Sequence, residues 1–338
     1  MTNKIHMIDT TMRDGSHAVS HSYTQEQVSM IARGLDEAGV EYIEITHGDG
    51  LAGSSINYGK SAVDEILLLE SARKQIKKGK LGILLLPGVG TIEDLDVAID
   101  TGIDAVRVAT HCTEADIAIQ HLKYAKKRGL FTVGFLMMTH MADAETLLEQ
   151  AKIFQECGVD YVNLADSAGH MTPNEVRHKI EYLVDGLDVP VGFHAHNNLG
   201  LAIGNSLAAL EAGATYIDMT CRGLGAGAGN AQGEVLASVL DMLGYNTGID
   251  IYKLQDVAQD IVAPLMHRPQ VIDTAALMLG YAGVYSSFLL HAYRAAEKFG
   301  LQPRDVLAEL GRKKMVGGQE DMIIDVAYAL SQERKQNK

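Results

Sequence analysis

Two histidines separated by one residue are the strongest local chemical signal in this 338-residue chain. His194 and His196 end an apolar segment, and residues i and i+2 of a strand point to the same side, so both imidazoles can converge on one ion. Asp14, which follows another apolar stretch, offers a carboxylate. Two imidazoles and one carboxylate leave positions open for water or substrate, and they suit Mn²⁺, Mg²⁺ or Co²⁺ as a Lewis acid better than redox iron. The alternative is a pair of histidines satisfied by neighbouring polar groups.

Arg13 and His17 flank this carboxylate in the sequence. A guanidinium can hold a carboxylate or keto oxygen in a fixed fork and stabilise developing negative charge, although an Arg–Asp pair can also be a structural salt bridge. His17 can act as a general base because an ordinary imidazole titrates near neutral pH, or it can be a plain surface residue. The glycine run at 223–230 is either a nest of backbone amides for an anion or a tight crossover without room for side chains.

A repeated pattern predicts the elements that position these residues. Four times, at spacings of 55 to 63 residues, the end of a helical stretch and a glycine precede an apolar strand; the glycines are Gly39, Gly102, Gly158 and Gly213. Further apolar stretches complete a set of eight, at residues 6–9, 81–87, 131–138 and 189–196. Eight βα units predict a (β/α)8 TIM barrel, whose sites lie at the C-terminal ends of the strands. A doubly wound sheet is less favoured because no GxGxxG follows the first strand.

The strand pattern stops near residue 258. The sequence therefore predicts a catalytic barrel over residues 1–258 and a helical domain over residues 259–338. That helical domain could cover the barrel mouth, bind a partner or only pack against the barrel.

Composition excludes several classes of function. The chain carries 29 Lys and Arg against 43 Asp and Glu, a net charge of −14, which disfavours binding to nucleic acid or to an anionic membrane. Three cysteines without a CxxC pair predict neither a disulfide framework nor a zinc knuckle. No signal-peptide segment opens the sequence and no apolar run is long enough for a bilayer, so we expect a soluble, cytoplasmic protein.

Several motifs together resemble a known superfamily, that of hydroxymethylglutaryl-CoA lyase, isopropylmalate synthase and related metal-dependent barrels. They are DTTMRDGSH (9–17), LADSAGHM (164–171), GFHAHNNLG (192–200) and GLGAGAGN (223–230). Within it the chain resembles the 4-hydroxy-2-oxovalerate aldolase (4-hydroxy-2-oxopentanoate pyruvate-lyase) family. The segments that carry this second resemblance are RDGSHAVSH (13–21), LLLPGVGT (84–91), HAHNNLGLA (194–202) and GYAGVYSSFLLHA (280–292). The resemblance covers essentially the whole chain, including a helical C-terminus that the lyase lacks.

The resemblance implies a class II aldolase that cleaves 4-hydroxy-2-oxopentanoate to pyruvate and acetaldehyde in the meta-cleavage catabolism of aromatic compounds. It implies that Asp14, His194 and His196 hold a divalent ion, usually Mn²⁺, and that Arg13 stabilises the pyruvate enolate.

It further implies that His17 takes the proton of the C4 hydroxyl, that Ser167 binds the pyruvyl end of the substrate and that Tyr285 positions His17 or the substrate. Arg13, Asp14, Ser167, His194 and Tyr285 would contact the substrate.

The resemblance also implies a partner, an acylating acetaldehyde dehydrogenase that takes the aldehyde, with the helical domain as the docking region. Two other hypotheses about the function remain open. One is an acyl-CoA-using relative, similar to isopropylmalate or citramalate synthase or to hydroxymethylglutaryl-CoA lyase. The other is an inactive barrel that serves as a scaffold for the dehydrogenase.

Overall fold

A closed barrel of eight parallel strands forms the larger part of the molecule. The computed structural model describes residues 4–336, and the strands follow one another around the barrel in sequence order, with β8 pairing with β1. The strands are β1 His6–Met12, β2 Tyr42–Ile45, β3 Lys80–Leu85, β4 Ala105–His111, β5 Phe131–Met137, β6 Tyr161–Asp166, β7 Val191–Ala195 and β8 Tyr216–Met219. The predicted TIM barrel is confirmed.

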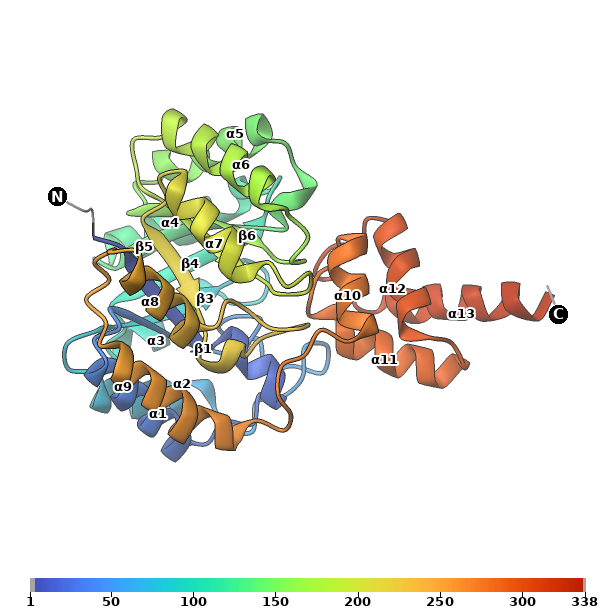
Figure 1. Ribbon diagram of the computed structural model, residues 1–338, viewed down its shortest axis with the longest axis horizontal. Helices are drawn as coiled ribbons and strands as arrows, with labels where there is room; N and C mark the ends of the chain where they lie inside the picture. Colours follow the sequence, from blue (N-terminus) through green and yellow to red (C-terminus); the bar gives the residue numbers. More distant parts are fainter. Residues whose placement is uncertain (1–3, 337–338) are drawn as a thin grey trace.

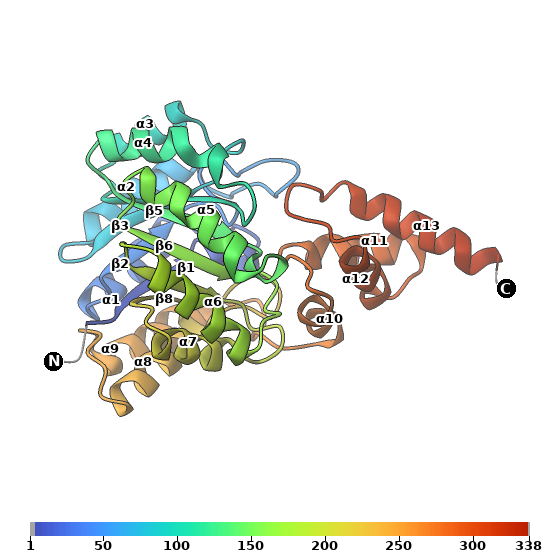
Figure 2. The ribbon, with the colours of Figure 1, turned by 90° about the horizontal axis from the view of Figure 1, so that it is seen from above.

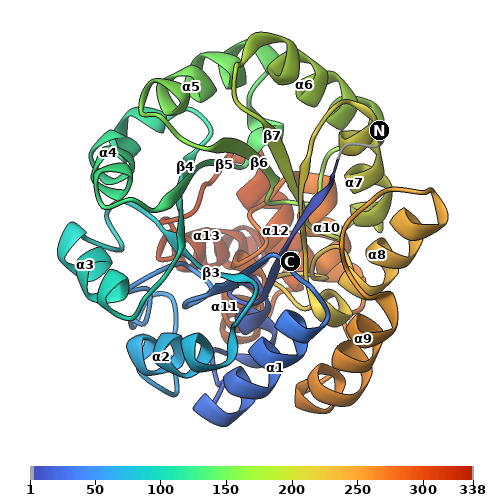
Figure 3. The same cartoon turned by 90° about the vertical axis from the view of Figure 1, so that its left-hand side faces the viewer.

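Helices surround this barrel and continue beyond it (Figure 3). Those of the outer layer are α1 Gln25–Glu37, α2 Glu65–Gln75, α3 Ile92–Asp100, α4 Ile119–Lys127, α5 Ala144–Glu156, α6 Pro173–Gly186, α7 Ala202–Glu211, α8 Gly233–Met242 and α9 Ile251–Asp256. Those of the C-terminal unit are α10 Thr274–Ala282, α11 Phe288–Phe299, α12 Pro303–Arg312 and α13 Met322–Gln336. Within residues 4–336 no helix is both long and apolar enough to cross a membrane.

The glycines of the repeat end helices as the sequence predicts. Gly39, Gly102, Gly158 and Gly213 have φ angles between +79° and +100°, a conformation that side-chain-bearing residues rarely adopt. Each reverses the chain after a helix and starts the next strand. The three cysteines, Cys112, Cys157 and Cys221, are buried and free.

The two largest hydrophobic cores belong to the barrel with its helices and to the C-terminal unit. The barrel core includes Val257 and Val262, which lie on a helical segment that runs without a break from α9 to Leu265, so the predicted boundary at 258 lies inside this segment. The second core begins at Ala275 and joins α10 to α13 around Phe288.

The C-terminal unit sits over the carboxyl ends of the strands (Figures 1 and 2). The backbone N–H and the hydroxyl of Ser286 both donate to the carbonyl of Ser167, at 3.1 and 2.6 Å. His140, after β5, donates from Nε2 to the carbonyl of Gly283 at 3.0 Å. These contacts place the unit over the barrel mouth, which is one of the three roles that the sequence left open for it.

Candidate active site

The predicted metal ligands meet inside the barrel mouth. Oδ2 of Asp14 lies 3.6 Å from Nε2 of both His194 and His196, and the two Nε2 atoms are 3.3 Å apart. All three side chains are buried. Nδ1 of His194 is 2.8 Å from Oδ2 of Asp218; by donating there it leaves the Nε2 lone pair facing the other two ligand atoms. Lone pairs that converge at these distances repel one another unless a cation lies among them, so this donor set fits a divalent ion.

The protonation states of Asp14 and His196 suit the same ion. Burial would raise the pKa of Asp14, but His196, Arg13 and the hydrogen bond with His194 hold it well below its usual range. Burial lowers the pKa of His196 to about 4, so its ring is neutral. Burial would also lower the pKa of His194, but the neighbouring carboxylates of Asp218 and Asp14 raise it, so this ring must give up its Nε2 proton when an ion binds. An ionised carboxylate and neutral imidazoles are the forms in which these residues bind metals.

A buried network of ion pairs contacts two of these three residues, Asp14 and His194. Arg13 donates from Nε to Glu44 at 2.5 Å and from Nη1 to Asp14 at 2.8 Å. Arg107 donates to both carboxylate oxygens of Glu44 and, at 2.5 Å, to Oδ2 of Asp218. Asp218 is therefore shared between Arg107 and His194, and Glu44 is shared between the two arginines. We call Arg13, Glu44, Arg107 and Asp218 the charge network.

Glu44, Arg107 and Asp218 were not predicted from the sequence. The signal was present, since each is a charged residue inside an apolar strand, in YIEI, AVRVATH and YIDM. A buried charge in such a strand destabilises the fold unless it is paired with an opposite charge. Because inward-facing residues of several strands meet inside a barrel, these three charges could have been expected to pair there.

The balance of buried charges at the site favours a cation. Two arginines face three carboxylates, those of Asp14, Glu44 and Asp218, which leaves one excess negative charge in a buried space. A divalent cation reverses that excess to one positive charge. In addition, Nη2 of Arg13 is buried and, among the described residues, has no hydrogen-bond partner. This N–H group is free to donate to a ligand oxygen beside the ion.

His17 lies at the edge of the same site, on the turn after β1. Its Nε2 atom is 4.0 Å from Oδ2 of Asp49, a buried carboxylate that can stabilise the charged imidazolium. The ring rests against the backbone of Gly48, where a Cβ would come within 2.3 Å of Nε2. Two more imidazoles are close: the His17 ring lies edge-on to His21, which stacks on His47 at 3.7 Å. Asp49 and Gly48 were not found from the sequence, although they follow β2 and so lie at a strand end.

Ser167 and Tyr285 also reach the mouth. Oγ of Ser167 accepts from the backbone N–H of Met138 at 3.0 Å, which leaves its own O–H to donate to a ligand. Burial, Asp49 and Asp14 raise the pKa of Tyr285, which therefore stays protonated and lies near those carboxylates. Tyr285 also lines a cavity with Asp49. The mouth thus contains all the site residues expected from the sequence.

The glycine run acts as a tight crossover. A Cβ at Gly229 would lie 1.8 Å from the carbonyl of Gly223, so the loop folds on itself without room for a side chain. The loop also orients the carboxylate of Asp14, whose Oδ1 accepts from the N–H of Ala226 at 3.1 Å and from the amide of Asn230 at 2.9 Å.

The end of β3 lines the cavity that holds Tyr285. Leu86 and Pro87 border this cavity, whereas Leu84 packs in the barrel interior and Leu85 in the outer core. Leu86 is therefore the leucine placed to contact a ligand there.

The chain is similar to known proteins over nearly its whole length. Residues 4–261 match the HMGL-like family, and residues 270–332 match the DmpG-like communication domain. A 4-hydroxy-2-oxovalerate aldolase of Moorella thermoacetica is 65% identical over 98% of both chains. Another, from Carboxydothermus hydrogenoformans, is 61% identical over 99% of this chain and 100% of its own length.

Solved structures support the fold. The carboxyl transferase domain of Rhizobium etli pyruvate carboxylase, in a structure with pyruvate and biocytin, gives a TM-score of 0.82 at 16% identity, over 98% of this chain and 61% of that one. The HMG-CoA lyase of Bacillus subtilis gives 0.67 at 22% identity, over 78% and 94%. The sequence relatives are far more similar to this chain, at 65% and 61% identity over nearly its full length. The chain therefore belongs to the 4-hydroxy-2-oxovalerate aldolases of the HMGL-like family.

Proposed function

We propose that this protein cleaves 4-hydroxy-2-oxopentanoate to pyruvate and acetaldehyde. The observation that carries the proposal is the convergence of Asp14, His194 and His196 beside the unpartnered Nη2 of Arg13. This arrangement suits a small 2-oxo acid, which presents a carboxylate and a keto oxygen side by side. The names of the relatives support the same substrate.

The bond cleavage needs an electron acceptor at the keto group. A divalent ion held by Asp14, His194 and His196 supplies that electron withdrawal when it is bound. Arg13 donates from Nη2 to the oxygen on which negative charge develops, and Ser167 donates to the pyruvyl end. Because Arg13 is fixed by Glu44 and Asp14, its donor needs no reorganisation during the reaction.

His17 starts the cleavage by taking the proton of the C4 hydroxyl. The C4 oxygen then forms the aldehyde carbonyl while the C3–C4 bond breaks, and its electron pair passes into the pyruvate enolate. Asp49 stabilises the imidazolium that results, at 4.0 Å from Nε2. Acetaldehyde leaves, and protonation of the enolate at C3 gives pyruvate. No lysine is needed as a Schiff-base nucleophile.

Mn²⁺ is the ion we propose, with Mg²⁺ or Co²⁺ as substitutes, because the ligand set mixes nitrogen and oxygen donors. We also propose that the helical unit docks an acylating acetaldehyde dehydrogenase, in keeping with its match to a communication domain. Co-elution of the two proteins in size-exclusion chromatography tests this partnership, and separate elution at micromolar concentrations would count against it.

The activity test is release of pyruvate from 4-hydroxy-2-oxopentanoate, followed with lactate dehydrogenase and NADH. Chelator-stripped protein should be inactive, and Mn²⁺ should restore turnover without coenzyme A. Full activity after exhaustive chelation would refute the metal-dependent mechanism. A requirement for coenzyme A would favour the acyl-CoA-using alternative, and inactivity with every ion would favour the scaffold.

A further inference from the structure

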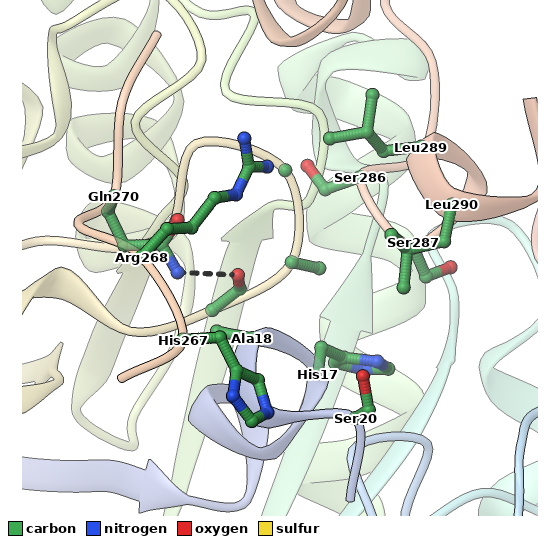
Figure 4. A pocket seen from close by; sticks show the side chains of 13 residues that line it. His17, Ala18, Ser20, His267, Arg268, Gln270, Ser286, Ser287, Leu289 and Leu290 are labelled. Atoms are coloured by element: carbon green, nitrogen blue, oxygen red, sulfur yellow. Dashed lines mark hydrogen bonds between the residues drawn. The ribbon is translucent and has the colours of Figure 1, made fainter. Parts of the chain in front are cut away.

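Three cavities open around the covered barrel mouth. The first, of about 270 Å³, lies between the turn after β1, the glycine run and the start of the helical unit (Figure 4). The second and third, of about 230 Å³ each, share Asp49 and Glu320 and lie toward β2 and β3. The first cavity is bordered by His17 and by Ala226, whose N–H holds Asp14, so it leads to the catalytic residues.

The cavities differ in charge. Arg268 and His267 line the first cavity, and none of its lining residues is an Asp or Glu. The third cavity has the opposite character, with Asp49, Glu114 and Glu320 and no Lys or Arg in its lining. The second mixes both signs. The protein as a whole carries a net charge of −14, so a cavity lined by an arginine and by no carboxylate differs from the acidic character of the chain.

Arg268 is free to bind a ligand. Its closest carboxylate is that of Asp273, at 3.8 Å from Nη1, and no hydrogen bond of its guanidinium is found within residues 4–336. The oxygens of Asp273 are already used, since Oδ1 caps α10 and Oδ2 accepts from Tyr293 at 2.8 Å. In Figure 4 the guanidinium reaches across the cavity in the direction of Ser286. Ser287, another residue of the cavity lining, has a buried hydroxyl that lacks a partner among the described residues.

We propose that the first cavity is the access route and docking subsite for the anionic 2-oxo acid, with Arg268 as the cation that receives its carboxylate. This inference rests on the proposed function, which makes the substrate an anion. A guanidinium in a cleft raises the local concentration of an anion and speeds its association, while the carboxylates of the third cavity repel it. The carboxylate then passes His17 to reach Arg13 and the metal ligands.

The test compares Arg268→Gln and Arg268→Glu with the wild-type, Mn²⁺-loaded protein. At low ionic strength kcat/KM for 4-hydroxy-2-oxopentanoate should fall about 3–10-fold in R268Q and by more than about 10-fold in R268E. In 0.5 M salt these differences should shrink to about 2-fold, because exposed charges are screened. In the reverse addition reaction the KM of pyruvate should rise, while the KM of the uncharged aldehyde stays constant.

Arg304→Gln is the matched control. Arg304 is as exposed as Arg268 (55% against 57%), stands at a similar distance from a carboxylate, 3.9 Å from Asp305, and lines none of the three cavities. Unchanged kcat/KM in R268E, an equal rise in the aldehyde KM, or the same loss in R304Q would each overturn the inference. Calorimetric titration with pyruvate makes the same comparison without turnover, so an inactive wild-type protein would refute the proposed function and still leave the docking subsite tested.

Discussion

Replacing Asp218 by Asn tests whether the charge network controls metal binding. The substitution keeps the shape of the side chain but removes the negative charge that Arg107 and His194 share, at 2.5 and 2.8 Å from Oδ2. His194 loses the partner that fixes its tautomer and ring orientation. Asp218 does not itself belong to the metal-ligand trio, so any effect on the ion passes through these two neighbours.

The expected magnitude follows from the network. Loss of a carboxylate that orients a ligand histidine weakens metal binding by about 10–100-fold, which corresponds to about 1.4–2.7 kcal/mol. The charge balance acts in the same direction, because the buried excess of one negative charge disappears and less charge remains to attract the cation. We therefore expect the Kd of Mn²⁺ to rise by at least 10-fold.

Calorimetric titration of Mn²⁺ into chelator-stripped protein measures this Kd. Asp166→Asn is the matched control, since Asp166 is equally buried at the end of β6 but its carboxylate accepts, among the described residues, only from the backbone N–H groups of His170 and Met171. Both variants should lose some thermal stability, whereas only D218N should lose metal affinity. A D218N protein that folds and binds Mn²⁺ within 2-fold of the wild type would refute the role of the network.

Three further predictions address single residues. Arg13→Ala should lower kcat by about 10²–10³-fold through loss of the donor at the developing charge; half of the wild-type kcat in a steady-state assay would contradict this role. Gly48→Ala should push the His17 ring aside, because its Cβ would lie 2.3 Å from Nε2, and kcat should fall by up to about 100-fold while Mn²⁺ content, measured by atomic absorption, is unchanged. Burial and His170 lower the pKa of His140 from 6.5 to about 4, so its neutral form is favoured in the folded state; this stability is complete above pH 6.5 and is lost as pH falls toward 4, by up to about 3 kcal/mol. Denaturant unfolding at pH 7.5 and 4.5 should therefore show a smaller decrease in His140→Gln than in the wild type, and equal decreases would exclude His140 as the cause.

The barrel could be predicted because its signals are local and repeated. A glycine that must adopt positive φ, such as Gly102, marks the end of a helix whatever lies around it, and an apolar run marks a buried strand. The convergence of the candidate metal ligands could be predicted for a similar reason, since His194 and His196 share one side of one strand. Asp14 joined them because the carboxyl ends of all barrel strands meet at one face.

Other parts of the site depend on contacts between distant segments. Arg107 meets Glu44 and Asp218 across 63 and 111 residues of sequence, and only the register and shear of the closed barrel decide which inward residues are neighbours. Ser286 is more distant still from its partner Ser167, and its role depends on how the helical unit docks. No pattern in the segment around Ser286 encodes that docking geometry.

The local charges of the site predict that a cation must bind before the substrate. An anionic 2-oxo acid that approached the bare trio would meet the excess negative charge of Asp14, Glu44 and Asp218 over the two arginines, in a buried space where charges interact strongly. With a divalent ion bound, the same groups carry one excess positive charge and attract the acid. Metal and substrate should therefore bind in that order, with pyruvate binding measurably only to the Mn²⁺-loaded protein. The charge network sets that order, because it fixes the number of carboxylates that the ion must balance.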